Sequence, residues 1–215
     1  MYFFEQVELR RREPRDDLLT RLVEAEVDGE RLTPMELGAF LILLLVAGNE
    51  TTTNLIGTAV RVLAEHPEMM ERIRNDRSLV WNLVEESLRM DAPIQGFYRK
   101  ARRDIKLAGQ QIKEGDPLCV LYGAGNRDPR EFECPAEFNL DGARRDHLAF
   151  GKGIHYCLGA NLARIEAGIA LNGVLDRFET LVPVAGQAVT WRPTPFFRGM
   201  DEYAVHYTLR TAPVA

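Results

Sequence analysis

The first part of the chain carries hydrophobic positions at helical spacing, divided by clear start and stop signals. We predict helices over residues 4–12, 18–27, 34–65, 67–76 and 79–90. Asp16 and Asp17 are suited to cap the second helix. Thr33, Pro34 and Glu36 combine a capping hydroxyl, a proline at the first helical position and an acid three residues after the cap, so they mark the start of the third helix.

The third predicted helix is unusual in its length and in its surface. Its run of about 32 residues is well above the average length of a helix in globular proteins. Residues 39–47 are apolar on every face, which predicts a helix buried all round inside a larger body. In a chain of this length, part of the apolar surface of this helix would have no other segment packed against it. We therefore also expect association or aggregation.

After Pro93 the pattern changes to short strand-like runs divided by turn residues. Strands are expected at residues 105–107, 118–121, 181–182 and 203–209. Residues 126–147 show little periodicity, which is typical of an irregular loop, and a last long helix is expected at residues 158–178. Helices first and short strands later indicate a mostly α, α+β fold.

Composition narrows the class of protein. The chain has 215 residues, of which 46% are hydrophobic and 27% are charged, so it can bury a sizeable core. Its net charge of −5 gives no reason to expect nucleic acid as a partner. The longest apolar stretch, residues 37–48, is shorter than the roughly 18 residues that a membrane span needs. With three cysteines and no visible signal peptide, a cytoplasmic protein without a membrane span is expected.

Candidate chemistry lies in residues 150–159, which have the sequence FGKGIHYCLG and directly precede the last predicted helix. The three glycines permit turns and close approaches that side chains block. Cys157 lies at the start of the helix, where the helix dipole favours a thiolate. Such a thiolate could be a nucleophile, a redox thiol or a metal ligand, while a buried structural cysteine is the simpler interpretation of an isolated one. His155 points elsewhere if the segment is extended, and no C-x-x-C pair supports redox or zinc chemistry.

These ten residues resemble the haem-binding loop of the cytochrome P-450 family, FGxGxHxCxG, at every fixed position. Three further segments agree, in the family's order. Residues 47–52 resemble the oxygen-activation motif of the long central helix, residues 86–89 the ExxR motif, and residues 95–99 the strand with a haem-propionate arginine. The resemblance runs from about Arg11 to Leu209, is strongest to soluble bacterial members, and implies the mostly α P-450 fold.

The resemblance implies haem b as the cofactor, with Cys157 as the axial ligand of the iron. A thiolate in this position pushes electron density onto the iron and favours O–O cleavage. Phe150 is expected near the sulfur, and His155 and Arg99 are expected to pair with the haem propionates. The other residues expected to line the haem are Leu44, Ala47, Gly48, Thr52, Gly151, Gly159 and Ala163.

Glu50 and Thr51 are the catalytic residues that the resemblance implies. Glu50 is expected to pass protons in from solvent, and Thr51 to hold hydrogen bonds to dioxygen at the haem. The alternative is structural: the threonines bond back to helix carbonyls and Glu50 lies on a solvated face. Peroxide-using members carry a different pair, so the acid–threonine pair favours an electron-fed monooxygenase over a peroxygenase.

Glu86 and Arg89 lie three residues apart on one helix face, and the resemblance implies a buried structural ion pair. A surface ion pair is the ordinary alternative. The loop position that often supplies a third partner, an arginine, is Gly142 here, so Arg144 and Arg145 are the candidates.

The implied substrate is a small hydrophobic organic molecule. Ile94, Phe97, Phe196 and Phe197 are candidates to line its pocket, and ordinary core packing explains them equally well. The implied electron donor is a ferredoxin or a flavodoxin. A candidate docking face, for which solvated surface is an equal explanation, consists of Lys100, Arg102, Arg103, Arg144, Arg145 and Lys152.

The family's full fold is much longer than this chain, and residues 1–215 correspond to its carboxy-terminal, haem-binding half. A fragment, a split enzyme completed by a second chain, and a natural truncation all account for this length. The competing functional hypothesis is a non-catalytic haem-binding or interaction protein derived from a truncated member. The absent amino-terminal half favours this second hypothesis, and the acid–threonine pair favours the first.

Overall fold

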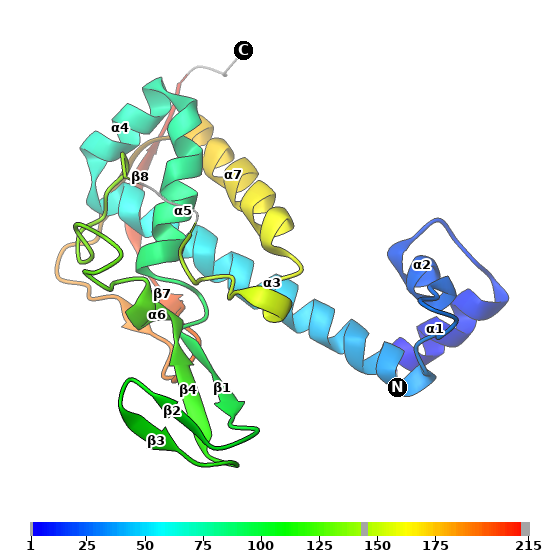
Figure 1. Ribbon diagram of the computed structural model, residues 1–215. Helices are drawn as coiled ribbons and strands as arrows, with labels where there is room; N and C mark the ends of the chain where they lie inside the picture. Colours follow the sequence, from blue (N-terminus) through cyan, green and yellow to red (C-terminus); the bar gives the residue numbers. More distant parts are fainter. Residues whose placement is uncertain (1, 143–145, 212–215) are drawn as a thin grey trace. The chain divides into compact units, whose positions relative to one another are not determined.

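The computed structural model describes residues 2–142 and 146–211. The chain divides into two compact units, Met1–Glu50 and Thr51–Ala215, and the boundary falls inside one long helix. Each unit has its own packing. Figure 1 gives the order of the elements along the chain.

The first unit contains helix α1 (Tyr2–Arg12), helix α2 (Leu18–Glu24) and the beginning of α3 (Pro34–Glu65). Asp17 caps α2 by accepting a hydrogen bond from the Thr20 N–H, as predicted. The predicted capping box opens α3, since the Thr33 N–H donates to the Glu36 carboxylate at 2.9 Å and the Glu36 N–H donates to Thr33 Oγ1 at 3.3 Å.

Helix α2 ends at Glu24, three residues before its predicted end. Val27 and Glu30 instead exchange backbone hydrogen bonds in an isolated β-bridge. Asp28 and Gly29 lie between them with positive φ angles of 53° and 81°. A turn of this kind cannot continue a helix, which explains the early end.

The expectation that α3 is buried all round is wrong for this chain. Leu37 is buried, and Phe4 of α1 packs closely against Gly38. Further along the same apolar stretch, the side chains of Ile42, Leu43, Leu45 and Val46 are 51–61% exposed. The first part of α3 therefore presents an apolar surface to solvent.

Helix α3 also bears on the expectation that the chain has no membrane span. Among the described residues, α3 is long and apolar enough for this, because the helix extends beyond the 12-residue apolar run. Length and composition alone do not distinguish a membrane-spanning helix from the core helix of a soluble protein.

The second unit is built around a helical core (Figure 1). Its longer helices are the rest of α3, α4 (Pro67–Asn75), α5 (Val80–Met90) and α7 (Ala160–Arg177), with a 3₁₀ turn, η1 (Arg77–Leu79), before α5. Helices α5 and α7 pack against each other. The core they share is formed by apolar side chains with 4% exposure or less, among them Leu55, Leu63, Ile73, Leu83, Leu88, Leu171 and Leu175.

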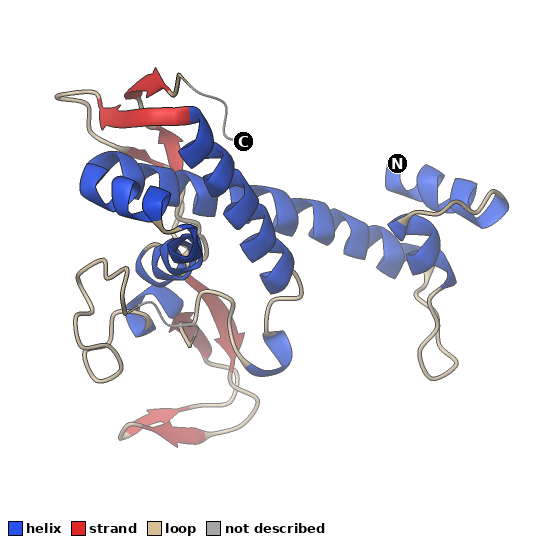
Figure 2. Cartoon of the chain, turned by 90° about the horizontal axis from the view of Figure 1, so that it is seen from above, coloured by secondary structure: helices blue, strands red, loops and turns tan. Residues whose placement is uncertain are grey.

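Short antiparallel strand pairs surround this core (Figure 2). In the described residues, β1 (Gly96–Lys100) pairs with β4 (Pro117–Leu121), β2 (Ile105–Leu107) with β3 (Gln110–Ile112), β5 (Phe178–Pro183) with β8 (Val205–Leu209), and β6 (Thr190–Trp191) with β7 (Met200–Glu202). Small sheets on a mostly helical body confirm the predicted fold class.

Strands β3, β6 and β7 were not predicted, and two short helical elements and the bounds of α7 also differ from the expectation. Helix α6 (Tyr122–Gly125) follows β4 directly, and a 3₁₀ turn, η2 (Gly153–His155), lies inside the cysteine loop. Helix α7 begins at Ala160 rather than residue 158, because Gly159 is its N-cap. It ends at Arg177, since Phe178 has an extended backbone and starts β5.

Candidate functional site

The cysteine loop, residues 150–159, folds back on itself just before α7. The Cys157 N–H donates to the Phe150 carbonyl at 2.9 Å, and the Gly151 N–H donates to the Leu148 carbonyl at 2.9 Å. Gly151 and Gly153 have φ angles of +68° and +69°, a region that glycine adopts without strain. These turns hold Cys157 at an exposed position close to the start of α7.

The cysteine loop exposes large apolar side chains close to Cys157 in sequence. Ile154 is 97% exposed and Leu158 is 82% exposed, although both are large hydrophobic residues. A Cβ placed on Gly159 would meet no atom within 4 Å. Exposed apolar side chains around an open position are typical of a surface that binds a partner or ligand.

These features fit haem. The described residues contain no cluster of three or more His, Cys, Asp or Glu side chains that could hold a metal ion by themselves. A single soft thiolate suits an iron whose other ligands come from a macrocycle. The exposed apolar side chains of Ile154 and Leu158 suit the apolar faces of such a ring.

A buried charged cluster lies behind the loop. Glu85 on α5 accepts hydrogen bonds from Arg164 on α7 (Nε to Oε1, 2.5 Å) and from His147 (Nε2 to Oε2, 3.2 Å). The guanidinium of Arg164 lies over the Phe150 ring at 4.5 Å, and its Nη1 donates to the Tyr156 hydroxyl at 3.3 Å. Burial acts to raise the pKa of Glu85, but the hydrogen bonds from His147 and Arg164 outweigh it and lower the pKa to about 2.

Arg99 is linked to the cysteine loop through Tyr122, a residue that the sequence did not single out. Arg99 on β1 donates from Nη2 to the Tyr122 hydroxyl at 3.3 Å. Tyr122 is buried at the start of α6, its ring packs edge-on against Phe97, and its hydroxyl lies 3.9 Å from where a Cβ on Gly151 would stand. The structure thus brings Arg99, Phe97 and the loop together, while the side chain of His155 is exposed.

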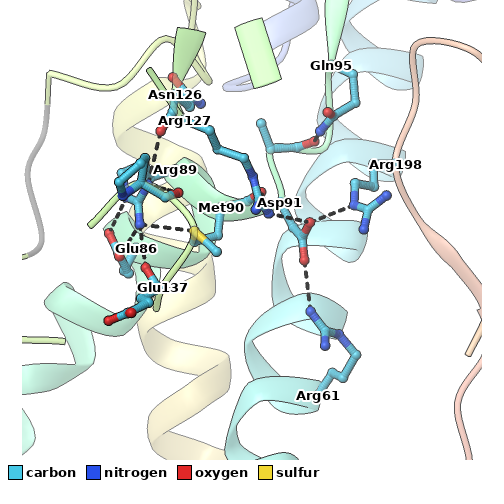
Figure 3. Close-up of polar contacts among 12 residues, drawn as sticks. Arg61, Glu86, Arg89, Met90, Asp91, Gln95, Asn126, Arg127, Glu137 and Arg198 are labelled. Carbon is cyan, nitrogen blue, oxygen red and sulfur yellow. Dashed lines mark hydrogen bonds and ion pairs between the residues drawn. The ribbon is translucent and has the colours of Figure 1, made fainter. Parts of the chain in front are cut away.

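Glu86 and Arg89 form a buried bidentate ion pair on α5 (Figure 3). Arg89 Nε lies 2.8 Å from Glu86 Oε2, and Nη2 lies 2.6 Å from Oε1. Their side chains are 1% and 4% exposed, so this pair is not a surface contact.

Backbone groups of the irregular loop complete this pair. Arg89 donates to the carbonyls of Asn126 at 3.0 Å, Pro135 at 3.1 Å and Glu137 at 2.7 Å, and the Asn139 N–H donates to Glu86. The α5 helix therefore anchors a loop that has no regular structure of its own. The candidate third partners, Arg144 and Arg145, lie outside the described residues.

The candidate substrate residues come from two segments that lie side by side. Ile94 and Phe197 form an isolated antiparallel bridge, and the Gln95 N–H donates to the Phe196 carbonyl at 2.7 Å. Phe97 is exposed on β1. Ile94 and Phe197 are thus joined directly through their backbones. The sequence could not indicate this contact between distant segments.

Asp91 holds these two segments together and was missed by sequence reasoning (Figure 3). It lies at the end of α5, is buried, and accepts hydrogen bonds from Arg198 at 2.6 Å and from Arg61 of α3 at 2.8 Å. The Arg198 N–H also donates to the Pro93 carbonyl. A lone aspartate after a helix resembles any capping residue, so the sequence carried no distinguishing signal.

The implied oxygen-activation residues lie in consecutive turns of α3. Leu44, Ala47, Gly48 and Glu50 belong to the first unit, and Thr51 and Thr52 to the second. A Cβ on Gly48 would meet no atom within 4 Å, and Thr52 is buried. Ala163, on the first turn of α7, donates its N–H to the Gly159 carbonyl at 2.9 Å. The roles of these residues toward haem and oxygen remain predictions.

The basic residues of the candidate docking face are exposed wherever the structure describes them. This holds for Lys100, Arg102, Arg103 and Lys152. Lys152 lies inside the cysteine loop, directly before η2. Long-range attraction to an acidic partner requires such solvent-exposed charges.

Comparisons with known proteins agree with this geometry. The cytochrome P450 family model matches residues 3–197. Cytochrome P450 109 of Bacillus spizizenii is 43% identical over 210 residues, which are 97% of this chain and 52% of that protein. The structure of CYP109Q5 from Chondromyces apiculatus aligns with a TM-score of 0.93 at 42% identity, over 98% of this chain and 54% of that one.

A further solved structure, CYP109E1 from Bacillus megaterium in complex with corticosterone, aligns with a TM-score of 0.89 at 38% identity, over 95% of this chain and 55% of that one. The chain spans about half the length of the relatives it matches. The family model covers most of the chain, and the haem-loop, ExxR and central-helix patterns lie within the matched residues. On these grounds the chain belongs to the cytochrome P450 family.

Proposed function

We propose that this chain is the carboxy-terminal, haem-ligating half of a cytochrome P450 monooxygenase. The whole enzyme inserts one oxygen atom from dioxygen into a small hydrophobic organic substrate, with electrons from a ferredoxin or flavodoxin. The observation that carries the proposal is the exposed Cys157, held by a glycine-rich loop just before α7 that also exposes the apolar side chains of Ile154 and Leu158. Members of the family carry haem b with a cysteine thiolate ligand.

The chain's own residues have separate tasks in this proposal. Haem, when bound, supplies the activation of dioxygen. The Cys157 thiolate would ligate the haem iron, and the backbone of Cys157 is fixed by the hydrogen bond from its N–H to the Phe150 carbonyl. Arg99 and His155 bind the propionates, for which the planar guanidinium of arginine is well suited. Gly151, Gly159 and Ala163 are assigned to line the haem, and the residues of α3 that the family resemblance gives this role are Leu44, Ala47, Gly48 and Thr52.

Proton delivery is assigned to α3. The Thr51 hydroxyl holds hydrogen bonds at the oxygen-binding side, and the Glu50 carboxylate moves protons in from solvent. Replacing Thr51 with Ala is expected to lower the product formed per dioxygen consumed.

The substrate pocket is assigned to Ile94, Phe97, Phe196 and Phe197. Their apolar side chains and the backbone bridge between the two segments favour a hydrophobic organic molecule. CYP109E1, which is similar to this chain, has been solved with corticosterone, a largely apolar molecule. The class of substrate proposed here is therefore apolar and of small-molecule size.

The proposed electron donor is an acidic protein that docks at Lys152 and the other basic residues of the candidate docking face. We place this reaction in the cytoplasm. Opposite surface charges speed association and make it depend on salt. Lys152→Glu is expected to slow reduction of the haem-loaded protein by ferredoxin, most strongly at low salt. An unchanged reduction rate at every salt concentration would remove this docking face from the proposal.

Haem titration of the chain tests the proposed cofactor. We expect uptake of one haem per chain, and a loss of affinity of more than about tenfold in Cys157→Ala. Cys119→Ala and Cys134→Ala are matched controls, because all three cysteines are exposed. Equal affinity in all four proteins would contradict the proposal. Haem uptake without any product from the reconstituted full-length enzyme would favour the non-catalytic haem-binding alternative.

A further inference from the structure

We propose that Arg164, held by Glu85 and His147, is a positioning residue that fixes the loop leading into Cys157. The inference rests on the proposed haem site and adds to it residues that lie outside the haem-loop and ExxR patterns. We call Glu85, His147 and Arg164 the loop clamp. Its members come from α5, from the segment before the cysteine loop and from α7.

Glu85 places Arg164 through two hydrogen bonds. Arg164 Nε lies 2.5 Å from Oε1, and Nη2 lies 3.0 Å from Oε2. The three residues of the clamp are between 3% and 6% exposed, so little water competes for these contacts. A buried bidentate pair of this kind orients the guanidinium plane as well as its charge.

His147 completes the clamp with a defined tautomer. Its Nδ1 accepts a hydrogen bond from the Ala149 N–H at 3.2 Å, so this nitrogen carries no proton. Nε2 therefore carries the proton and donates it to Glu85 Oε2 at 3.2 Å. Both Glu85 oxygens are thus occupied, and His147 ties the clamp to the backbone immediately before the cysteine loop.

The free side of the Arg164 guanidinium contacts two residues of the cysteine loop that precede Cys157, one at the start of the loop and one next to the cysteine. Nη1 donates to the hydroxyl of Tyr156, the residue before Cys157, at 3.3 Å. The guanidinium carbon lies 4.5 Å from the Phe150 ring, and the Phe150 carbonyl accepts the Cys157 N–H. One planar group therefore restrains both arms of the loop, which a lysine ammonium could not do while keeping two bonds to Glu85.

Amide hydrogen exchange of the chain tests this role without needing haem. Tyr156→Phe removes one hydroxyl and leaves no buried charge unpaired, so it is expected to fold. Arg164→Lys keeps the positive charge beside Glu85. We expect both variants to speed exchange at the Gly151 and Cys157 amides by about tenfold, the size of one lost hydrogen bond to a charged group. Amides in the core of α5 and α7 should change little.

Arg77→Lys is the matched control, because Arg77 also joins α7, through Asp176, but far from the loop along the helix. It should leave loop exchange unchanged. In haem-loaded protein, Tyr156→Phe and Arg164→Lys should also reduce the red-shifted Soret fraction of the reduced, carbon monoxide-bound spectrum. Unchanged loop exchange in Tyr156→Phe and Arg164→Lys, or equal acceleration throughout α7, would overturn the proposal. Failure of the haem arm alone would count against the haem site and not against the clamp.

Discussion

At the scale of single residues, the backbone angles divide the glycines of the cysteine loop into two kinds. Gly151 has a φ angle of +68°, and a Cβ there would lie 3.3 Å from the His155 carbonyl oxygen. Gly159 has a φ angle of −86° as N-cap of α7, and a Cβ there would meet nothing within 4 Å. Of these two positions, only Gly151 needs glycine for the backbone conformation itself, as does Gly153 with its φ angle of +69°.

Gly151→Ala is therefore expected to lower the free energy of unfolding by about 1–2 kcal/mol, the cost of a left-handed conformation with a side chain. Gly159→Ala should lower it by much less. Urea unfolding followed by circular dichroism measures both. Equal losses in the two variants would show that the positive φ angle does not set the requirement for glycine.

Breaking the Glu86–Arg89 pair is expected to lower the free energy of unfolding more than Gly151→Ala does, because it leaves a buried charge without its partner. Arg89→Ala should lower the free energy of unfolding by about 3–5 kcal/mol. The control is Arg130→Ala, since Arg130 forms an exposed pair with Asp128 and should be dispensable. A similar urea midpoint for Arg89→Ala and the wild type would contradict a structural role of the buried pair.

The limits of sequence reasoning are clear at this scale. The spacing of Glu86 and Arg89 on one helix face predicted that they could pair, because side chains three residues apart lie together. The further partners of Arg89 are backbone carbonyls of an aperiodic loop. Because every residue has a backbone carbonyl, the sequence does not indicate which of them accept these hydrogen bonds. Tyr122 and Asp91 were missed for a related reason, since their contacts depend on elements distant in sequence.

At the scale of elements, α3 shows what local signals do and do not determine. Its start at Pro34 and its end at Glu65 were predicted, because caps and prolines act through neighbouring residues. Its burial was not, because burial depends on what else packs against the helix. The apolar run that favoured a fully buried helix is largely exposed in this chain.

The exposed apolar side chains of α3 are expected to cause self-association. Leu43→Glu, at a position 61% exposed, should shift the chain toward monomer in sedimentation velocity experiments, since a charge opposes burial of that surface. Met35→Glu is the matched control, because Met35 is exposed on the same helix before the apolar run. A monomeric wild type would contradict this prediction.

At the scale of the whole molecule, the fold class was predictable because helical periodicity extends over long segments, whereas the placing of α6 and η2 was not. Stability, too, depends on contacts between distant segments. The loop clamp joins α5 to α7, and the folded-state pKa of Glu85, about 2, lies below its ordinary value of 4.5. The clamp therefore stabilises the fold above pH 4.5, and this contribution is lost as the pH falls from 4.5 toward 2.

Glu85→Gln should accordingly be less stable than the wild type at neutral pH, and the difference should shrink as the pH falls through this range. Urea unfolding of both proteins at a series of pH values measures the difference. Subtracting one curve of unfolding free energy against pH from the other removes the contribution of the carboxylates that both proteins contain. A difference in unfolding free energy that stays constant down to low pH would show that the Glu85 carboxylate does not contribute through its charge.

The reduced, carbon monoxide-bound absorption spectrum of the haem-loaded chain tests the central claim, that Cys157 ligates the haem iron, most directly. The account predicts a strongly red-shifted Soret band that disappears in Cys157→Ala and persists in Cys119→Ala and Cys134→Ala. A red-shifted band that survives in Cys157→Ala, or folded chain that takes up no haem, would contradict it.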